Sequence, residues 1–362
     1  MIYRKSNHFN KDRLHNQRYA RRMNPRRHTK HSAFLSGHTV FHSEKKLFQL
    51  YLFLLFITLI LVGTTLNRLE LGITVEQLRK EGIDYDSFRE LIVPVQKLQE
   101  VEKAYNQSSK QRNVKSDSNS QDPGPADYFT ISMLLSKYDL SSVRTAGKRN
   151  MNYLIGELRN NKSYMELKSY YQAILADIKC FPVVPDAGGR FNITFTDTWN
   201  QHRSYGGNRR HEGTDLMSGE NIRGEYPVIS MTDGTVEKMG WLEQGGYRIG
   251  IRGTYGAYFY YAHLESYAKE LKVGDTVKAG QFLGYMGDSG YGSEGTVGKF
   301  DVHLHVGIYV ETGFGELSVN PYWILRYLET LDTAKTSSSS NLSGTKDTGR
   351  RAGIKTEEYA RL

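Results

Sequence analysis

The stretch from Leu47 to Leu66 constrains this chain more than any other, because it runs for twenty residues without a charged side chain. A helix rises about 1.5 Å per residue, so such a stretch spans about 30 Å, the hydrocarbon thickness of a bilayer. Lys45 and Lys46 precede it, and Arg68 follows it. A buried core helix fits poorly because of the length, and a cleaved signal peptide fits poorly because of the long arm ahead. We therefore predict a transmembrane helix over residues 47–66.

The positive charge of the chain is concentrated ahead of this stretch. The net charge is +9, and residues 1–46 hold 12 of the 48 Lys and Arg side chains but only 2 of the 39 Asp and Glu side chains. Basic flanks stay on the cytoplasmic side of a membrane, so we predict a disordered cytoplasmic arm over residues 1–46, a single membrane pass and an extracytoplasmic remainder. Because that remainder is almost neutral, the basicity does not indicate a nucleic-acid-binding protein.

Residues 69–107 carry apolar side chains at helical spacing and are predicted to form a helical stalk. Thr74 and Gln77 have the spacing of a capping box, which would start a helix there. Gly82 is expected to end a helix, and Pro94 is expected to kink one. A solvent-facing amphipathic spacer is the simplest interpretation of this segment.

The next residues divide into a linker and a second helical region. Ser, Asn, Asp and Pro dominate residues 108–127, as in linkers, whereas residues 128–185 return to helical patterning. One stripe in the second region has the spacing of a buried helix face: Tyr164, Leu167, Tyr171, Ile174, Leu175 and Ile178. We interpret the stripe as core or as a docking surface. Residues 74–180 as a whole are a candidate region for self-association or for binding a protein partner.

Residues 186–331 change character to short apolar or alternating runs bounded by glycine and aspartate. This pattern is typical of antiparallel strands joined by tight turns, and it predicts a mainly β domain of the sandwich or open-barrel class. Strands are expected at Pro227–Ser230, Thr235–Trp241, Tyr247–Arg252, Ala257–Leu264, Gln281–Met286 and Val302–Val310. A short closing helix is expected over residues 322–331, and a disordered tail over residues 332–362.

The last of these strands carries two histidines on one face. Side chains alternate along a strand, so His303 and His305 share a side, about 7 Å apart, and the opposite side is wholly aliphatic. By itself, a His-x-His strand is more often a pair of hydrogen-bonded histidines than a metal site. Other residues have to decide between the two interpretations.

Further candidate ligands lie ahead of the strands. His211 and Asp215 are four residues apart, and the chain can turn both toward one point through Gly213. Together with His305 they make three ordinary zinc ligands and leave a fourth position for water, which distinguishes a catalytic zinc site from a structural one. The single cysteine, Cys180, excludes a cysteine-rich zinc module, so histidine and aspartate have to serve.

One more histidine lies at the end of an aromatic run. His263 follows Tyr258 to Ala262 on a separate predicted strand. A neutral imidazole beside a zinc-bound water can take the proton of that water during attack on a carbonyl. His263 and His303 are the candidates for this proton transfer.

The order of these elements resembles that of the lysostaphin-type (LytM-like) zinc endopeptidases over about residues 191–328. His-x-x-x-Asp is followed by an Asp-Gly turn, an aromatic strand ending in Ala-His-Leu, a Gly-Asp hairpin, Gly-x-x-Gly and His-Leu-His. The resemblance implies a LytM-like catalytic domain in a membrane-anchored endopeptidase, with one zinc ion (Zn2+) per chain. Its implied substrate is a peptide bond in the stem or cross-bridge peptides of peptidoglycan.

The resemblance also implies roles for single residues: zinc ligation by His211, Asp215 and His305, catalysis by His263 and His303, and contact with the developing oxyanion by Tyr205. The chain departs from the family in the loop before His-x-His. That loop, Tyr291 to Val302, is longer than usual and leaves the shape of the groove open.

A second class of function stays open at this point. Some LytM-like membrane proteins are not enzymes, and they regulate wall hydrolases or join a partner across an intermembrane space, as in sporulating bacteria. Such relatives commonly lack a metal or catalytic residue, whereas this chain has all five. The resemblance therefore favours the enzyme over the scaffold.

Overall fold

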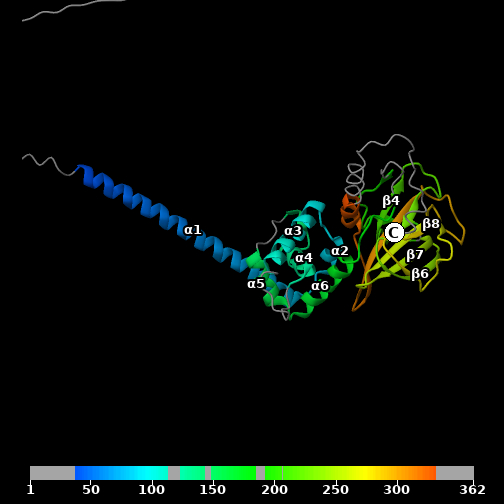
Figure 1. The fold of residues 1–362 in the computed structure, drawn as a ribbon, viewed down its shortest axis with the longest axis horizontal. Helices are drawn as coiled ribbons and strands as arrows, with labels where there is room; N and C mark the ends of the chain where they lie inside the picture. The colour runs from blue at the N-terminus through cyan, green and yellow to red at the C-terminus, as the bar shows by residue number, and fades with distance from the viewer. Residues whose placement is uncertain (1–36, 113–122, 143–147, 185–191, 206, 332–362) are drawn as a thin grey trace, which may run out of the picture. The chain divides into compact units, whose positions relative to one another are not determined.

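The computed structural model describes residues 37–112, 123–142, 148–184, 192–205 and 207–331 (Figure 1). Contacts divide the chain into two compact units, one up to Thr64 and one from Thr65. Most of the predicted disordered arm and all of the predicted disordered tail fall on residues 1–36 and 332–362, outside the described residues.

Helix α1 (Gly37–Glu81) contains the predicted membrane span. Its portion from Glu44 to Glu81 is long and apolar enough to cross a membrane, and its apolar window is not buried in the protein. Leu47 and Phe56 are 68% and 61% exposed. An apolar surface of this length is unfavourable in water, so the helix is a candidate membrane span. Because α1 begins ahead of Leu47, residues 37–46 of the predicted arm are helical instead of irregular.

Helix α1 also continues past the predicted start of the stalk. Thr74 lies inside it, and its hydroxyl donates a hydrogen bond to the backbone oxygen of Glu70 (3.2 Å). The prediction that Thr74 and Gln77 start a helix is wrong, because the helix upstream propagates through them. Gly82, with a φ of 76°, follows the last residue of α1 as predicted, since glycine adopts the left-handed conformation without steric cost.

Two helices, not one kinked helix, come next. Helix α2 (Tyr85–Glu90) begins after Asp84, whose carboxylate accepts a hydrogen bond from the backbone N–H of Ser87 (3.1 Å). Helix α3 (Val95–Arg112) begins directly after Pro94. The predicted kink is a break between helices, because proline disfavours a helical residue before it and has no N–H to continue the hydrogen bonding of α2.

Helices α2 to α6 contribute to one hydrophobic core. The other three are α4 (Pro125–Leu135), α5 (Lys148–Leu158) and α6 (Lys162–Leu175), with a 3-10 helix, η1, at Leu140–Ser142. Buried side chains come from each of the five α-helices: Phe88, Leu98, Ile131, Leu154 and Tyr171. The solvent-facing stalk is therefore a wrong prediction, and the aromatic stripe of α6 belongs to the core. Helices α3 and α4 also take up both ends of the predicted linker.

An antiparallel β sheet follows, which confirms the predicted fold class. Its main path runs β1-β4-β11-β8-β7-β6-β9, with β10 paired to β5 and β8 and with β12 paired to β11. The strands are β1 (Ile193–Thr194), β4 (Thr214–Ser218), β5 (Pro227–Ile229), β6 (Gly234–Leu242), β7 (Gly246–Gly253), β8 (Tyr258–Tyr267), β9 (Thr276–Val277), β10 (Phe282–Met286), β11 (His303–Thr312) and β12 (Gly315–Val319). Figure 1 shows β4, β8, β7 and β6 within this sheet. Strands β2 (His202–Arg203) and β3 (Arg209–Arg210) form a separate ribbon, and residues 322–331 form the predicted helix.

All six predicted strands are present. Among the strands that were not predicted, β4 and β12 pair directly with β11. Strand β4 pairs with the first half of β11, β12 pairs with its second half, and β8 pairs with its middle. Both missed strands are short and carry polar side chains within them, so their alternation is weak. With three neighbours, β11 is a rigid support for its histidines.

Arg89 ties α2 to the sheet. Its Nε donates to the backbone oxygen of Ser318 (2.9 Å), and its Nη2 donates to Oε1 of Glu212 (2.9 Å). Its guanidinium also lies over the ring of Trp199, 5.5 Å from the centroid. Because Glu212 follows His211 in the chain, the helical region contacts the segment that carries a candidate ligand.

Candidate active site

Strand β11 divides its side chains between two faces as predicted. The aliphatic ones are all at most 2% exposed: Val302, Leu304, Val306, Ile308 and Val310. On the other face, pairing with β4 places His305 opposite Asp215, and pairing with β8 places it opposite Ala262, next to His263. The sheet register thus brings together residues that lie far apart in the sequence.

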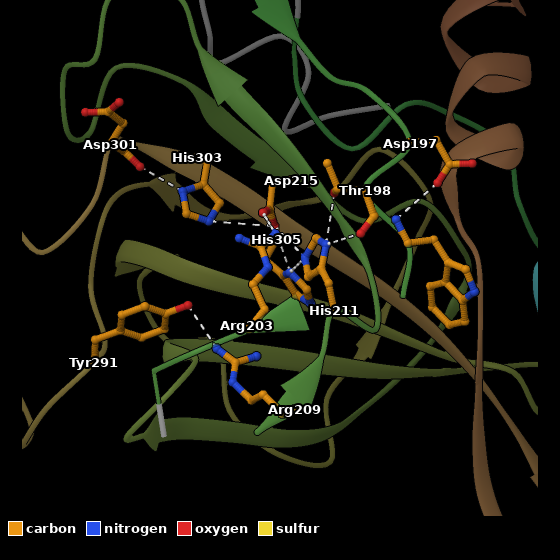
Figure 2. Close-up of polar contacts among 11 residues, drawn as sticks. Asp197, Thr198, Arg203, Arg209, His211, Asp215, Tyr291, Asp301, His303 and His305 are labelled. Carbon is orange, nitrogen blue, oxygen red and sulfur yellow. Dashed lines mark hydrogen bonds and ion pairs between the residues drawn. The ribbon is translucent and has the colours of Figure 1, made fainter. Parts of the chain in front are cut away.

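His211, Asp215 and His305 converge on one point (Figure 2). Oδ1 of Asp215 lies 3.0 Å from Nε2 of His211 and 2.9 Å from Nδ1 of His305, and the two nitrogens are 3.1 Å apart. Gly213 permits this approach, because a Cβ at that position would collide with the ring of His305. The turn through Gly213 that the spacing predicted is present.

This donor set fits a zinc ion. Zinc takes imidazole nitrogen and carboxylate oxygen at about 2.0–2.2 Å in a tetrahedral arrangement, which places neighbouring ligand atoms about 3.3 Å apart. The three atoms here have similar separations, and His211 is only 2% exposed. His211, Asp215 and His305 are the residues that would hold the metal.

The electrostatics of the cluster favour the protonation states that metals require. Burial would raise the pKa of Asp215, but hydrogen bonds with His211 and His305 outweigh burial and hold that pKa well below its usual range. Burial lowers the pKa of His305 by more than its contact with Asp215 raises it. A charged carboxylate beside a neutral imidazole is the state that binds a divalent cation.

Two residues that the sequence did not single out orient these ligands. Nδ1 of His211 lies 3.1 Å from the backbone oxygen of Thr198 and 2.9 Å from its hydroxyl, and these contacts orient the ring so that Nε2 faces Asp215. Arg203, on β2, donates from Nη2 to Oδ2 of Asp215 (2.7 Å). No spacing rule reveals either residue, because both reach the cluster from segments outside the main sheet path.

His263 and His303 lie beside this cluster, with their ring centroids 4.7 Å apart. Nδ1 of His263 lies 2.7 Å from the backbone oxygen of Ser289, and Nδ1 of His303 lies 2.7 Å from that of Asp301. A carbonyl oxygen only accepts hydrogen bonds, so both Nδ1 atoms carry protons and Nε2 is the nitrogen of each ring left to exchange a proton. Burial, with the charge of neighbouring histidines, holds the pKa of His263 well below its usual value. His263 is therefore neutral, with an unprotonated Nε2.

The backbone at His263 is unusual. Its φ is 62°, a left-handed conformation that costs a non-glycine residue on the order of 1 kcal/mol. The register of β8 shifts against β7 between Tyr261 and Leu264, a stretch that contains His263, which is the signature of a bulge. Bulges re-aim side chains and are common beside active sites. The sequence gives no sign of it, since no glycine or asparagine occupies the position.

The long loop before β11 forms a wall of the site. The ring of Phe300 lies 4.6 Å from that of His263 and 5.0 Å from that of His303, centroid to centroid. Tyr291 packs edge-on against Phe300 at 4.8 Å. The extra residues of this loop thus contribute aromatic surface directly beside both candidate catalytic histidines.

Tyr205 lies behind this wall. Its ring stacks on Tyr291 with centroids 4.1 Å apart and planes 3° apart. Tyr291 lines the groove described below, whereas Tyr205 is not among its lining residues. Contact of Tyr205 with an oxyanion stays a prediction.

An open groove of about 900 Å³ runs over the cluster. It is lined by all five predicted metal and catalytic residues and by Arg203, Tyr291 and Phe300. Its volume falls at the upper end of the range of ligand sites, about 300–1,000 Å³. Burial raises the pKa of Tyr258, in the same groove, to about 12, so this phenol is neutral and able to donate a hydrogen bond. A His-Asp-His triad, two adjacent imidazoles and a large open groove together suit hydrolysis of an extended substrate.

Comparison with known proteins gives concordant matches. The family described as peptidase family M23 matches residues 209–321, which contain all five residues. The L-Ala–D-Glu endopeptidase of Bacillus subtilis (strain 168) is 44% identical over 146 residues, which cover 40% of this chain and 44% of that protein. The glycyl-glycine endopeptidase ALE-1 of Staphylococcus capitis is 38% identical over 88 residues, covering 24% of this chain and 22% of that protein. The chain spans less than half the length of the curated relatives it matches.

A solved structure matches over a longer region. The crystal structure of a LytM protein from Ruminococcus gnavus ATCC 29149 shares 41% identity with a TM-score of 0.58, covering 71% of this chain and 96% of that one. The β sheet alone, from Ile193 to Val319, is far shorter than 71% of the chain. The similarity therefore extends into the helical region, which the motif pattern did not include.

Proposed function

The chain belongs to peptidase family M23, and we propose that it is a membrane-anchored zinc endopeptidase that hydrolyses peptide bonds of peptidoglycan. One observation carries the proposal. Two separate sets of side chains meet in one groove, a His-Asp-His triad that fits a metal and a pair of histidines that are each held at Nδ1 by a backbone oxygen. A non-catalytic scaffold would not require a metal triad together with a second pair of histidines.

In this proposal the side chains share the work in two groups. His211, Asp215 and His305 hold the metal, and zinc supplies Lewis acidity that polarises a carbonyl and makes water nucleophilic near neutral pH. His263 and His303 accept the proton of the attacking water at Nε2 and return it to the departing amine. Their Nδ1 hydrogen bonds to backbone oxygens keep each ring in the tautomer that this task needs.

The substrate is proposed from the relatives. The Bacillus subtilis L-Ala–D-Glu endopeptidase shares 44% identity, compared with 38% over a shorter region for the staphylococcal glycyl-glycine endopeptidase. We take the L-Ala–D-Glu bond of stem peptides as the first bond to test.

The place of action is proposed from α1. With this helix in the membrane and the basic residues 1–46 in the cytoplasm, the β domain lies outside, where peptidoglycan is. The proposal predicts that one Zn2+ binds per chain and that no nucleic acid is needed as a partner.

Digestion of purified peptidoglycan tests the function. The full chain, purified in detergent and loaded with zinc, is expected to release soluble fragments whose new amino termini mass spectrometry identifies. His303→Ala is expected to abolish release while zinc content and the circular dichroism spectrum stay unchanged. A folded, zinc-loaded wild-type protein that releases nothing from peptidoglycans of several stem and cross-bridge types would overturn the enzyme and favour a regulatory or scaffold role.

A further inference from the structure

One face of the sheet forms the floor of the groove beyond the metal triad. The register places Gly307 of β11 opposite Tyr260 of β8, and Tyr260 opposite Gly250 of β7. Side chains alternate along a strand, so Arg248 lies on the same face of β7 as Gly250. Two strand spacings of about 4.8 Å separate β7 from β11, which places Arg248 about 10 Å along the floor from the strand of His305. Both residues line the groove.

Three other cations of the groove have acidic or hydroxyl partners, whereas Arg210 is exposed and donates to the backbone oxygen of Asn200. Arg203 pairs with Asp215 (2.7 Å), and Arg209 donates to the hydroxyl of Tyr291 (2.9 Å). Lys238 lies 3.8 Å from a carboxylate oxygen of Glu316. The charges of Arg203 and Lys238 are therefore compensated within the protein, and Arg209 has a hydrogen-bond partner.

Arg248 differs from them. Its Nη1 atom is buried and has no hydrogen-bond partner among the described residues. Nε of Arg203 is also buried without a partner, but Arg203 forms an ion pair with Asp215, whereas no carboxylate of the described residues forms one with Arg248. A buried guanidinium N–H without an acceptor is unfavourable, because it has lost water and gained nothing in exchange. A ligand with a hydrogen-bond acceptor would therefore bind favourably to this guanidinium.

Two tyrosines pack against the backbone on either side of Arg248. A Cβ at Gly250 would collide with the ring of Tyr258, and a Cβ at Gly245 would collide with the hydroxyl of Tyr260. Both tyrosines therefore lie close against the backbone that flanks Arg248. Burial raises the pKa of each phenol, so both remain neutral and neither can supply the missing negative charge.

We propose that Arg248 forms a subsite for a free carboxylate of the substrate peptide, within about three residues of the bond that is cut. The distance of about 10 Å from β11 corresponds to about three residues of extended peptide, at about 3.3 Å per residue. A guanidinium binds a carboxylate through two parallel hydrogen bonds, which an amide cannot reproduce. The subsite rests on the proposed function, and it makes the protein selective for acidic over amidated peptides.

Stem peptides can present such a carboxylate from two sources, the α-carboxyl of D-Glu and the side-chain carboxyl of a diamino acid in the third position. Three synthetic peptides, each with its carboxyl-terminal D-Ala amidated, separate them: L-Ala-γ-D-Glu-diaminopimelate-D-Ala, the same peptide with the D-Glu α-carboxamide, and the same peptide with the side-chain carboxyl of diaminopimelate amidated. Each is given to the full chain in detergent, loaded with zinc. Cleavage is followed by mass spectrometry, and binding to the His303→Ala protein is followed by calorimetry.

Amidation of one of the two carboxyls is expected to lower kcat/KM and affinity about 10- to 100-fold, which is the usual worth of a hydrogen-bonded charge. In Arg248→Gln the acidic and amidated peptides are expected to become equal in kcat/KM and in affinity. Arg248→Lys is expected to restore part of the preference, because it restores charge without the planar fork.

The outcomes separate the subsite from the enzyme. Cleavage with equal rates for all three peptides, or a preference that persists in Arg248→Gln, would overturn the subsite and leave the peptidase standing. A binding preference that Arg248→Gln removes, without any cleavage, would support the subsite and overturn the peptidase. Thermal unfolding of Arg248→Gln, expected to match wild type or to exceed it, shows whether the variant is folded.

Discussion

Nη2 of Arg203 lies 2.7 Å from Oδ2 of Asp215, the carboxylate oxygen that is not shared with the two imidazoles. The contact fixes the carboxylate so that only Oδ1 faces His211 and His305. A residue that orients a ligand in this way typically contributes a factor of about 10 to 100 in metal affinity.

Arg203→Ala is therefore expected to weaken zinc binding by about 10- to 100-fold, measured by competition with a chromophoric chelator. Arg210→Ala is the matched control, since Arg210 lies on the same ribbon and donates only to the backbone oxygen of Asn200 (3.3 Å). Equal zinc affinities for the two variants would contradict the role of Arg203.

Gly213→Ala is expected to disrupt the triad. The new Cβ would collide with the ring of His305 and lie 2.7 Å from the backbone oxygen of Val306, so the ring or the strand has to move. Overpacking of this kind costs about 1–3 kcal/mol, and the expected readouts are a lower melting temperature and loss of bound zinc in elemental analysis.

Gly313→Ala provides the comparison for that variant, because a Cβ at Gly313 meets nothing within 4 Å. It is expected to keep wild-type zinc content. If both alanine variants retain one zinc per chain, a Cβ at position 213 does not displace His305.

Leu154→Ala tests whether the helical region is a packed core. Leu154 is fully buried in α5, and truncation of such a side chain costs about 2–5 kcal/mol. Met165→Ala, on α6 and 58% exposed, is expected to change stability by no more than about 0.5 kcal/mol. Urea unfolding of the protein in detergent measures both, and similar small effects would favour the solvent-facing spacer.

Membrane insertion is tested by charges in α1. Phe56→Arg combined with Leu59→Arg places two charges in the middle of the apolar stretch, each costing about 2.5–3.5 kcal/mol at the centre of a membrane helix. The protein is expected to leave the membrane fraction after an alkaline carbonate wash. Leu69→Arg with Ile73→Arg adds the same charge beyond Arg68 and is expected to remain bound; identical fractionation of both pairs would speak against the span.

The strand that carries His303 and His305 was predictable because alternation is a local property. Five aliphatic residues on one face specify the core side, and the two histidines are then forced onto the other. The meeting of His211 with His305 needed more than alternation. It was expected from the order of family elements, and it depends physically on the register between β4 and β11, which no local pattern sets.

The errors have physical causes of the same kind. Thr74 and Gln77 carry a helix-start pattern, but a helix already under way passes through it, since extension costs less than nucleation. The apolar positions of α2 and α3 were correctly spaced, yet spacing does not say what covers a face. Arg203, Arg248 and the bulge at His263 depend on tertiary approach, so the sequence alone could not place them.

The hydrogen bonds that orient His263 and His303 both end on main-chain oxygens, those of Ser289 and Asp301. A main-chain oxygen persists whatever side chain its residue carries, so point mutation at either position leaves the acceptor in place. Asp215 is held by a side chain, that of Arg203, which one codon change can remove. We therefore expect that substitutions disturb the orientation of Asp215, and with it metal binding, more readily than the orientation of His263 and His303.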